Sequence, residues 1–529
     1  MGNCWYISAM AVLAYREDLL EKIIVTKSYC PQGAYMVRLC KDGYWKIILI
    51  DDLFPCDQYD RLMYSKTKRR QLWVPLIEKA AAKLHGCYEA LTSGRTVEAL
   101  SLLTGEPCER IDLQETDTKI PVNEGKIWRK LLYARRSKYL MGTSCGSGSM
   151  KNVDQGYYKS QGLVALHAYS LLDVQDVEGN QLVQIRNPWG HESWKGEWCD
   201  SSPKWKELSS NSKSKIKTDG NKKGIFWMAF KDFMKFFDSV DICKVRPDWQ
   251  ESRHKGTFPC NSAYPWKFFK LAVVNKTEVD FGLFQKSLRG LKNRNEDLVD
   301  LLIVVLEDSD DGKSFKRVVK HSHRALRSFV GCDVELKPGQ YTVACLAFKH
   351  WKISSNVTVS QELEFNKDFV LTIHSSGLVI TEEVDTVSGH FKYLIADTII
   401  QLAIDKGISK NLYPDLKTYS LNWCGEIFVV ENNSSKQYSF IECDYTGRSH
   451  LLTSRGDFKT LDSIPPKHRQ VIAVLSPQDS RHGWSFSRQM KSSLSKDKYL
   501  PSNWGAGSRI EHKPLITLQL SGLHDPRPF

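Results

Sequence analysis

Hydrophobic and polar positions near the start of the chain repeat with the period of α-helices. Residues 4–14 combine small and apolar side chains, a composition typical of a helix buried inside a domain. Four segments are predicted to be helical from such composition or from i, i+3, i+4 spacing: 4–14, 15–24, 71–86 and 96–103. Gly86 ends the third segment and Gly105 comes shortly after the fourth, as is typical of helix ends.

Strand patterns interrupt and then follow these helices. The β-rich runs 34–40 and 44–51 flank an Asp-Gly pair, which predicts a tight hairpin. A glycine- and serine-rich segment at 142–148 precedes two further β-rich runs, 163–174 and 181–186. The pattern therefore predicts a helical lobe over 1–145 and a β-rich lobe over 146–246.

The middle of the chain is a series of β-rich runs separated by turn residues. The runs lie at 268–274, 301–307, 341–348 and 369–374. Their spacing predicts a β-sandwich over 255–380, with residues 308–312 as a hairpin turn. Such a domain serves either as a packing module or as a binding surface for partners or acidic lipid, and the pattern leaves both open.

The last part of the chain mixes helix and strand signals. A helix is predicted at 393–406, and strands are predicted at 426–430 and 471–475. The polar segments 432–436 and 480–498 are predicted to be exposed loops. We expect a separate mixed domain over 385–529.

Composition narrows the function classes. The 529 residues are 41% hydrophobic and 26% charged, with a net charge of +13, an ordinary balance for a globular protein of two to four domains. No apolar run approaches the ~18 residues of a membrane span, and no secretory signal opens the chain. The 14 cysteines form no C-x-x-C pair, which argues against a zinc site or a disulfide framework. We expect reduced thiols, a cytoplasmic location and no nucleic-acid partner, with the basic run at 66–70 as a solvated face.

Cys4 is the first candidate for chemistry. It follows Gly2-Asn3, and Asn3 is a good N-cap, so Cys4 is predicted to lie in the first helical turn. The helix dipole there favours a thiolate over a thiol. Taken alone, the same pattern also fits a capped core helix with an inert buried cysteine.

His167 and Asn187 complete a recognisable set. Each has an ordinary explanation, because a lone histidine in an apolar strand is often a core residue and an Asn before Pro is a common turn former. Together with Cys4, however, they give the order Cys, His, Asn of papain-like proteases. A catalytic cysteine needs a base, and the base needs a third group to orient it. Trp189 is expected to cover the His–Asn hydrogen bond.

Several longer motifs resemble the calpain protease core. They are Gly-Asn-Cys-Trp at 2–5, Leu-Trp-Val-Pro-Leu-Ile-Glu-Lys-Ala at 72–80, Lys-Leu-His-Gly at 83–86, Gly-Leu-Val-x-x-His-Ala-Tyr at 162–169, Arg-Asn-Pro-Trp-Gly at 186–190, Trp-x-Gly-x-Trp at 194–198 and Gly-Ile-Phe-Trp-Met at 224–228. The Cys-Lys-Asp-Gly hairpin and the tail beyond residue 385 resemble the small optic lobes (calpain fifteen) branch. The resemblance implies Cys4 as nucleophile, His167 as base and acid, and Asn187 as its orienter. It also implies limited cuts in intracellular proteins and regulation by calcium.

The chain departs from the family at its start. The family carries a Gln six residues before the nucleophile, where its side chain helps hold the oxyanion, and this position would precede Met1. Loss of one oxyanion donor typically costs about a hundred- to thousandfold in rate. Zinc fingers found upstream in the branch are also outside this sequence. We therefore expect an N-terminally truncated chain.

The second departure concerns calcium. At positions where the resemblance implies acidic ligands, this chain has Ser101, Ser193, Lys223 and Ile225, and Asp200 remains. Calcium requires several oxygen ligands, so neither core site is expected to bind it strongly. No EF-hand loop is present in the sequence, and we expect no required cofactor and no metal ligands.

These observations combine into one expectation. The fold class is α+β: a papain-like two-lobed calpain core over 1–246, a C2-like calpain β-sandwich over 255–380 and a small-optic-lobes-type domain over 385–529. The expected function is a calpain-type cysteine endopeptidase that acts on protein substrates, with a protein partner bound through the C-terminal domain and no membrane insertion. The alternative is a catalytically impaired form that acts as a regulatory or binding scaffold.

Overall fold

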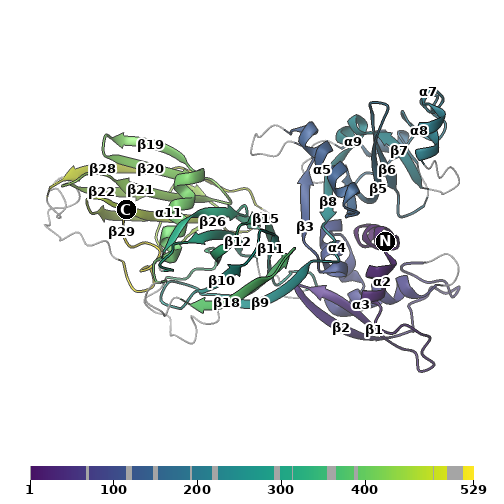
Figure 1. The fold of residues 1–529 in the computed structure, drawn as a ribbon, viewed down its shortest axis with the longest axis horizontal. Helices are drawn as coiled ribbons and strands as arrows, with labels where there is room; N and C mark the ends of the chain where they lie inside the picture. Colours follow the sequence, from purple (N-terminus) through teal and green to yellow (C-terminus); the bar gives the residue numbers. More distant parts are fainter. Residues whose placement is uncertain are drawn as a thin grey trace. The chain divides into compact units, whose positions relative to one another are not determined.

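The structure is a computed structural model whose described part forms two compact units. The first unit comprises Met1–Pro247 and Arg289–Lys292, and the second comprises Asp248–Leu288 and Asn293–Phe529. The structure describes residues 2–529 except 67–70, 115–121, 147–149, 151–152, 191–192, 217–223, 291–297, 313, 354–364, 386–390, 480–481 and 497–515. Figure 1 colours the chain by residue number from purple at the N-terminus to yellow at the C-terminus, so the first unit begins in purple and the second ends in yellow.

The first part of the first unit is helical, as its pattern predicts. It contains α1 (Cys4–Leu13), α2 (Glu17–Ile23), α3 (Trp73–His85), the 3-10 helix η2 (Glu89–Leu91) and α4 (Thr96–Thr104). Their apolar faces share one core, with Trp5, Ile77 and Leu100 among its buried members. Gly86 and Gly105 end α3 and α4 with positive φ angles of 106° and 67°, which glycine adopts without strain.

A two-stranded hairpin packs on these helices. Strands β1 (Ala34–Lys41) and β2 (Tyr44–Asp51) pair antiparallel, with Lys41 opposite Tyr44. Asp42 and Gly43 both have positive φ, 52° and 76°, as a two-residue type I′ turn requires. The predicted Asp-Gly hairpin is confirmed.

A six-stranded antiparallel sheet forms the rest of the first unit. Its strands are β3 (Cys108–Asp112), β4 (Leu140–Cys145), β5 (His167–Val177), β6 (Asn180–Arg186), β7 (Ile225–Ala229) and β8 (Phe237–Cys243), in the spatial order β3-β8-β4-β5-β6-β7. The accompanying helices are α5 (Glu124–Arg136), α6 (Gln155–Ser160), α7 (Lys204–Glu207), α8 (Ser210–Lys215) and α9 (Phe230–Phe236). Residues of α5 and α9, including Trp128 and Phe233, share a core with the sheet.

The predicted boundary between the lobes at residue 145 is wrong. Strands β3 and β4 pair with β8, and β4 also pairs with β5, so the sheet begins at Cys108. Helix α5 packs in the sheet's core rather than with α1–α4. The physical reason is that strand pairing is non-local: the run 140–145 has every residue buried between two partner strands, which its glycine and serine content conceals in the sequence.

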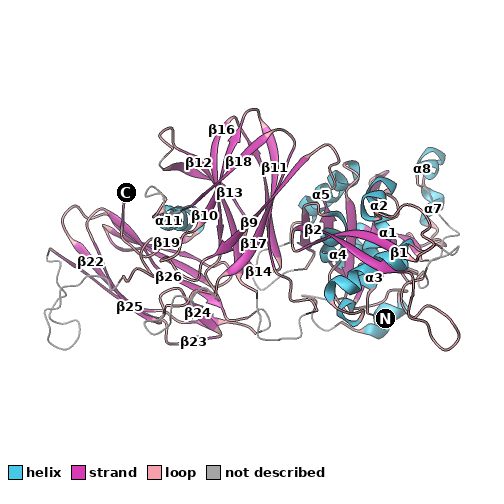
Figure 2. Cartoon of the chain, turned by 90° about the horizontal axis from the view of Figure 1, so that it is seen from below, coloured by secondary structure: helices cyan, strands magenta, loops and turns pink. Residues whose placement is uncertain are grey.

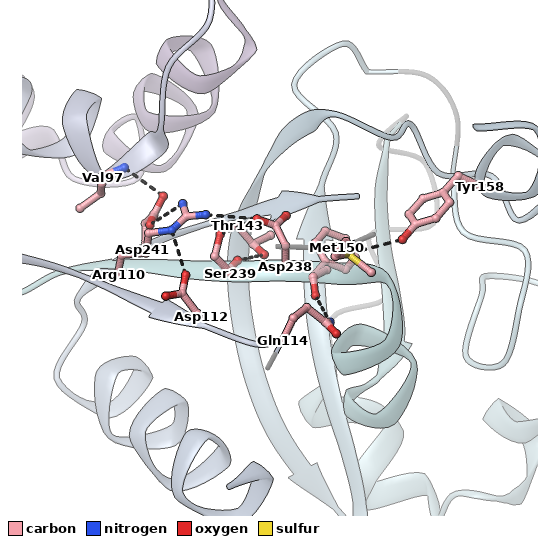
Figure 3. A network of polar contacts seen from close by, with 11 residues as sticks. Val97, Arg110, Asp112, Gln114, Thr143, Met150, Tyr158, Asp238, Ser239 and Asp241 are labelled. Carbon is pink, nitrogen blue, oxygen red and sulfur yellow. Dashed lines mark hydrogen bonds and ion pairs between the residues drawn. The ribbon is translucent and has the colours of Figure 1, made fainter. Parts of the chain in front are cut away.

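A buried ionic network ties α4 to the sheet (Figure 3). Arg110 and Asp241 lie opposite each other on β3 and β8, between the backbone hydrogen bonds Leu113 N–H to Asp238 O and Lys244 N–H to Pro107 O. They therefore form a non-hydrogen-bonded pair, in which side chains are closest. Arg110 also donates to Asp238 and Asp112 at 3.1 and 3.3 Å. Asp241 accepts the N–H of Val97 in the first turn of α4 at 3.0 Å.

The second unit begins with two antiparallel sheets. One has the order β15-β11-β17-β9 and the other β13-β12-β16-β10-β18, with β14 beside β12. Their bounds are β9 (Gln250–Phe258), β10 (Lys267–Val273), β11 (Thr277–Gln285), β12 (Asp300–Asp308), β13 (Phe315–His321), β14 (Ala325–Leu326), β15 (Phe329–Leu336), β16 (Gly339–Leu346), β17 (Lys367–Ser375) and β18 (Val379–Asp385). The two sheets share one apolar core. The four strands predicted here and the hairpin turn after Asp308 are confirmed.

The described residues in the rest of the second unit form helix α11 and further sheets (Figure 2). The elements are α11 (Leu394–Lys406), β19 (Ile408–Tyr413), β20 (Leu416–Leu421), β21 (Glu426–Asn432), β22 (Tyr438–Asp444), β23 (Arg448–Ser449), β24 (Leu451–Thr453), β25 (Lys459–Ile464), β26 (His468–Pro477), β27 (Ser485–Phe486), β28 (Gln489–Ser495) and β29 (Arg527–Pro528). The main sheet has the order β19-β20-β21-β26-β24. Helix α11 contributes Ile395, Ile399 and Leu402 to the same core as the two preceding sheets.

The predicted exposed loop at 480–498 is partly wrong. Its described part contains β28, which pairs with β22 along seven residues from Tyr438↔Ser495 to Asp444↔Gln489. The strand is polar because it lies at the edge of a three-stranded sheet, and a polar edge strand carries no hydrophobic alternation to detect. Among the residues that the structure describes, no helix is both long and apolar enough to cross a membrane.

Candidate active site

Cys4 is the first residue of α1, as predicted, but Asn3 does not cap the helix with its side chain. The Asn3 carbonyl accepts the N–H groups of Tyr6 and Ile7 at 3.0 and 3.1 Å. The Asn3 side chain instead donates to the carboxylate of Glu78 on α3. The predicted side-chain cap is therefore wrong, because a buried carboxylate competes for the Asn3 amide.

Glu78 is a buried anchor for the segment that leads into α1. Its carboxylate also accepts the backbone N–H of Ser65 at 2.9 Å and the Ser65 hydroxyl. Burial raises the pKa of Glu78, while these hydrogen bonds act in the opposite direction. Glu78 thus fixes the residue immediately before Cys4. Glu78 lies within the motif at 72–80, and its one sequence signal is a charge inside an apolar helical run.

A short loop holds the other side of the same turn. The indole N–H of Trp5 donates to the carbonyl of Leu91 at 2.8 Å, and the N–H of Ser93 donates to the carbonyl of Gly2 at 2.7 Å. Trp5 is buried, whereas Cys4 is half-buried. The helix thus buries the residue after the cysteine and leaves the thiol partly exposed.

His167 and Asn187 are brought together by a direct hydrogen bond. His167 is the first residue of β5, and Asn187 follows β6 in the adjacent hairpin arm. His167 Nε2 lies 3.0 Å from Asn187 Oδ1. Backbone hydrogen bonds fix the position of Asn187, because its N–H donates to Gly224 O at 2.7 Å and its carbonyl accepts the N–H of Gly190.

The surroundings of the pair fix which ring nitrogen carries the proton. The backbone N–H of Trp189 also points at Asn187 Oδ1, at 3.0 Å, so this atom must be the amide oxygen. An oxygen accepts only, so His167 Nε2 is the protonated nitrogen of the neutral ring and Nδ1 is the basic one. The arrangement holds an oriented imidazole base.

Aromatic rings enclose the imidazole. The Trp189 ring centroid lies 4.1 Å from that of His167, and Tyr169 meets it edge-on at 4.9 Å. His167 and Asn187 are 3% and 0% exposed, while Trp189 is 46% exposed. Trp189 therefore packs on the His167 ring while remaining partly exposed to solvent, and its predicted cover of the His–Asn hydrogen bond stays a prediction.

Helix α1 and strand β5 are joined one turn after Cys4. The Ser170 hydroxyl on β5 donates to the carbonyl of Ser8 at 2.9 Å. Ser8 follows Cys4 by four residues on α1, and Ser170 follows His167 by three on β5. The element that carries Cys4 therefore packs directly against the element that begins at His167.

The positions implied as calcium ligands offer few oxygens. Lys223 lies outside the described residues. Ser101 is buried within α4, where its carbonyl accepts the N–H of Gly105, and Ile225 is an apolar residue of β7. Ser193 and Asp200 are the remaining described positions, and of these two only Asp200 carries a carboxylate. Calcium takes six to eight oxygen ligands, so these residues do not fit it. The described residues also contain no cluster of three or more His, Cys, Asp or Glu side chains arranged to hold a metal.

Two family models match parts of the chain. The family model described as "Calpain family cysteine protease" matches residues 1–244, and "Calpain-D-like, C-terminal domain" matches residues 402–498. The chain is 41% identical over 250 residues to the "Calpain-type cysteine protease DEK1" of Arabidopsis thaliana, which covers 47% of this chain and 11% of that protein. It is 27% identical over 389 residues to the mouse "Calpain-2 catalytic subunit", which covers 70% of this chain and 51% of that protein.

The relatives are longer than the matched region. Human "Calpain-9" is 29% identical over 429 residues, a match that covers 73% of this chain and 59% of that protein. The chain thus spans about a tenth of the length of the plant relative and between half and three fifths of the two animal relatives.

Proposed function

We propose that residues 1–244, which the calpain family model matches, form a cysteine protease in which Cys4, His167 and Asn187 are a catalytic triad that hydrolyses peptide bonds in protein substrates. The observation that carries the proposal is the hydrogen bond from His167 Nε2–H to Asn187 Oδ1, because it leaves Nδ1 as the basic nitrogen. A papain-like order of residues without an oriented base would support no reaction.

The proposed reaction follows from these atoms. His167 Nδ1 takes the Cys4 thiol proton, and the thiolate attacks the scissile carbonyl carbon to form a tetrahedral intermediate. The imidazolium returns the proton to the leaving amine, which gives a thioester on Cys4. Water, deprotonated by the same imidazole, then attacks the thioester carbonyl carbon. The C–S bond breaks, the acid product leaves, and the imidazolium returns its proton to the Cys4 sulfur. The N-terminal turn of α1 favours negative charge on the sulfur.

Selective labelling of Cys4 tests the triad. The full chain is treated at mildly acidic pH with a thiol-directed epoxide peptide probe, and labelled residues are mapped by mass spectrometry. Cys30 is an internal control, because it is also half-buried and free. We expect Cys4 to react selectively, and His167→Ala to slow its labelling by about a hundredfold or more. If Cys4 reacts no faster than Cys30, the triad does not operate and the scaffold alternative is favoured.

We further propose that the chain belongs to the small optic lobes branch and that residues 385–529 bind substrate or partner proteins. The match of residues 402–498 to a calpain-D-like C-terminal domain supports this assignment. The proposal predicts that the strand order β19-β20-β21-β26-β24 recurs in an experimental structure of another such domain. A different strand order there would contradict the assignment.

We also infer that the first unit binds calcium weakly. Because Ser101 and Ile225 offer no carboxylate, calorimetric titration of the full chain with calcium is expected to show no binding at micromolar concentrations. Asp200→Asn is the matched variant, since it removes the remaining described carboxylate among the implied positions. Micromolar binding that Asp200→Asn abolishes would contradict the inference.

A further inference from the structure

Arg289 belongs to the first unit although it is far from Cys4 in sequence. Arg289–Lys292 belong to the first unit, while the residues before and after them belong to the second. The family model that matches residues 1–244 does not include this segment. The contacts of Arg289 explain its assignment.

The guanidinium of Arg289 makes four contacts within the first unit. Nη1 donates to the carbonyl oxygens of Ala90 and Ser93 at 2.9 and 2.7 Å. Nη2 donates to the Glu98 carboxylate on α4 at 2.7 Å. The guanidinium carbon lies 4.2 Å from the centroid of the Trp5 ring, in the position of a cation–π contact. The Arg289 side chain is 14% exposed.

The backbone around these contacts leaves room for them. A Cβ at Gly94 would lie 2.6 Å from both Arg289 Nη2 and the Trp5 ring. Gly290 has a φ of +77°, and a Cβ there would lie 1.9 Å from the carbonyl oxygen of His85. Glycine at both positions therefore permits the approach of Arg289 to Trp5.

The same contacts reach both sides of Cys4. The loop that Arg289 binds is the loop that holds α1: Leu91 accepts the indole N–H of Trp5, and Ser93 donates to Gly2. Arg289 thus fixes the loop through two carbonyl oxygens and covers the Trp5 ring at the same time. Cys4 lies between Gly2 and Trp5, so its thiol moves if either anchor moves.

We propose that Arg289 is a positioning residue for the Cys4 nucleophile. Its guanidinium joins the Trp5 ring to the loop 90–93 and thereby sets the orientation of the first turn of α1. This inference rests on the proposed role of Cys4. It extends the protease machinery to a residue beyond the segment that the family model matches.

The chemistry of the contact requires arginine. A planar guanidinium can stack on an indole while its edge N–H groups donate to two carbonyls and a carboxylate. A lysine retains the charge and one donor group but cannot make all four contacts at once. Arg289→Lys is therefore expected to rescue the function in part, whereas Arg289→Ala loses it.

The experiment measures Cys4 reactivity and local order in the full chain. Wild type, Arg289→Ala and Arg289→Lys are compared for the rate of Cys4 alkylation by the epoxide probe, with Cys30 as internal reference. Amide hydrogen exchange of segments 2–7 and 90–98 is measured in parallel. Arg135→Ala is the matched control, because Arg135 pairs with Asp173 elsewhere in the first unit.

We expect Arg289→Ala to slow Cys4 alkylation at least tenfold and to raise exchange in both segments at least tenfold. Arg289→Lys should be intermediate, and Arg135→Ala and the Cys30 rate should be unchanged.

The other outcomes either overturn the proposed role of Arg289 or show that the catalytic triad, and not this role, has failed. Faster exchange with an unchanged Cys4 rate would make Arg289 merely structural. Unchanged exchange in both segments would overturn the positioning role of Arg289, whatever the labelling shows. If Cys4 is labelled neither in wild type nor in any of the variants, that result refutes the triad, and the exchange data alone decide the role of Arg289. If Arg289→Ala does not fold, Arg289→Lys decides by the same two measurements.

Discussion

Asn187 Oδ1 is the atom on which the proposed chemistry depends most. It accepts from both His167 Nε2 and the Trp189 N–H, so the imidazole is fixed in tautomer and in orientation. The backbone of Asn187 is in turn bonded to Gly224 and Gly190. The base is therefore positioned by a rigid turn rather than by a mobile side chain alone.

Substitutions of Asn187 test whether its side chain orients the His167 ring by accepting a hydrogen bond from it. Asn187→Ala removes the acceptor, and the imidazole loses its fixed position, so we expect Cys4 alkylation to fall about a hundredfold. Asn187→Asp keeps an acceptor and adds a charge that raises the pKa of His167. Its rate is expected to stay closer to wild type, with the alkaline limb of the pH profile moved upward. The rate is measured from pH 5 to 9, with Asn180→Ala at the start of β6 as control. An unchanged rate in Asn187→Ala would refute the orienting role.

Helix α4 is the element that connects the helices of the first unit to its sheet. Asp241 on β8 binds its first turn through the Val97 N–H, and Cys243, two residues on, lies 3.2 Å from the Thr104 hydroxyl in its last turn. The network around Asp241 contains Arg110, Asp112 and Asp238 (Figure 3). Both ends of the helix are therefore fixed by the same strand.

The burial of Asp241 gives the first unit a pH-dependent stability. Burial raises the pKa of Asp241 to about 6, against the lowering effect of Arg110. The folded state then binds this proton more tightly than the unfolded state. The free energy of unfolding is expected to fall as pH rises from about 4 through about 6, by on the order of 1–3 kcal/mol, and to level off near pH 7. Asp241→Asn should remove this difference. Urea unfolding of both chains at pH 4.5 and 7 measures it, and an equal pH dependence in the two would contradict the assignment.

In the second unit, a buried ion pair joins the sheets of residues 250–385 to the main C-terminal sheet. Arg324 and Asp300 are both 0% exposed in their side chains, and the guanidinium also donates to Leu475 O at 3.0 Å and to Ser476. Asp300 accepts the N–H groups of Phe348 and Lys349 at 2.9 and 2.6 Å. These contacts, with the core that α11 shares, explain why Asp248–Leu288 and Asn293–Phe529 form one unit. The prediction of two separate domains at 255–380 and 385–529 stays a prediction.

Removal of one partner of this pair is expected to be costly. Arg324→Met leaves Asp300 buried without its counter-charge, and we expect about 3–5 kcal/mol less stability in this unit. The double variant Arg324→Met/Asp300→Asn removes both charges and should recover part of the loss. Native-state hydrogen exchange of β12 and β26 measures the local free energy. A single variant that exchanges as slowly as wild type would show that the pair adds nothing.

Local patterns predicted the parts of the fold that depend on local interactions. The helices α1 to α4, the hairpin β1–β2 and the position of Asn187 at the end of a strand follow from periodicity, turn residues and glycine caps. The strand β5 begins at His167 rather than at Leu163, because Leu166 adopts a positive φ of 55° that breaks the run. Such a conformation is rare for leucine and has no sequence signal.

The sequence by itself determined the residue types and their order: a cysteine at a helix start, then a histidine and an asparagine on neighbouring strands. Tertiary structure decided how they are held. The Asn3 side chain turns to Glu78, strands β3 and β4 join the sheet of β5, and Arg289 covers Trp5. Each of these contacts joins residues far apart in the chain. Short-range periodicity reports which side chains are buried, but it contains no information on which distant partner meets them.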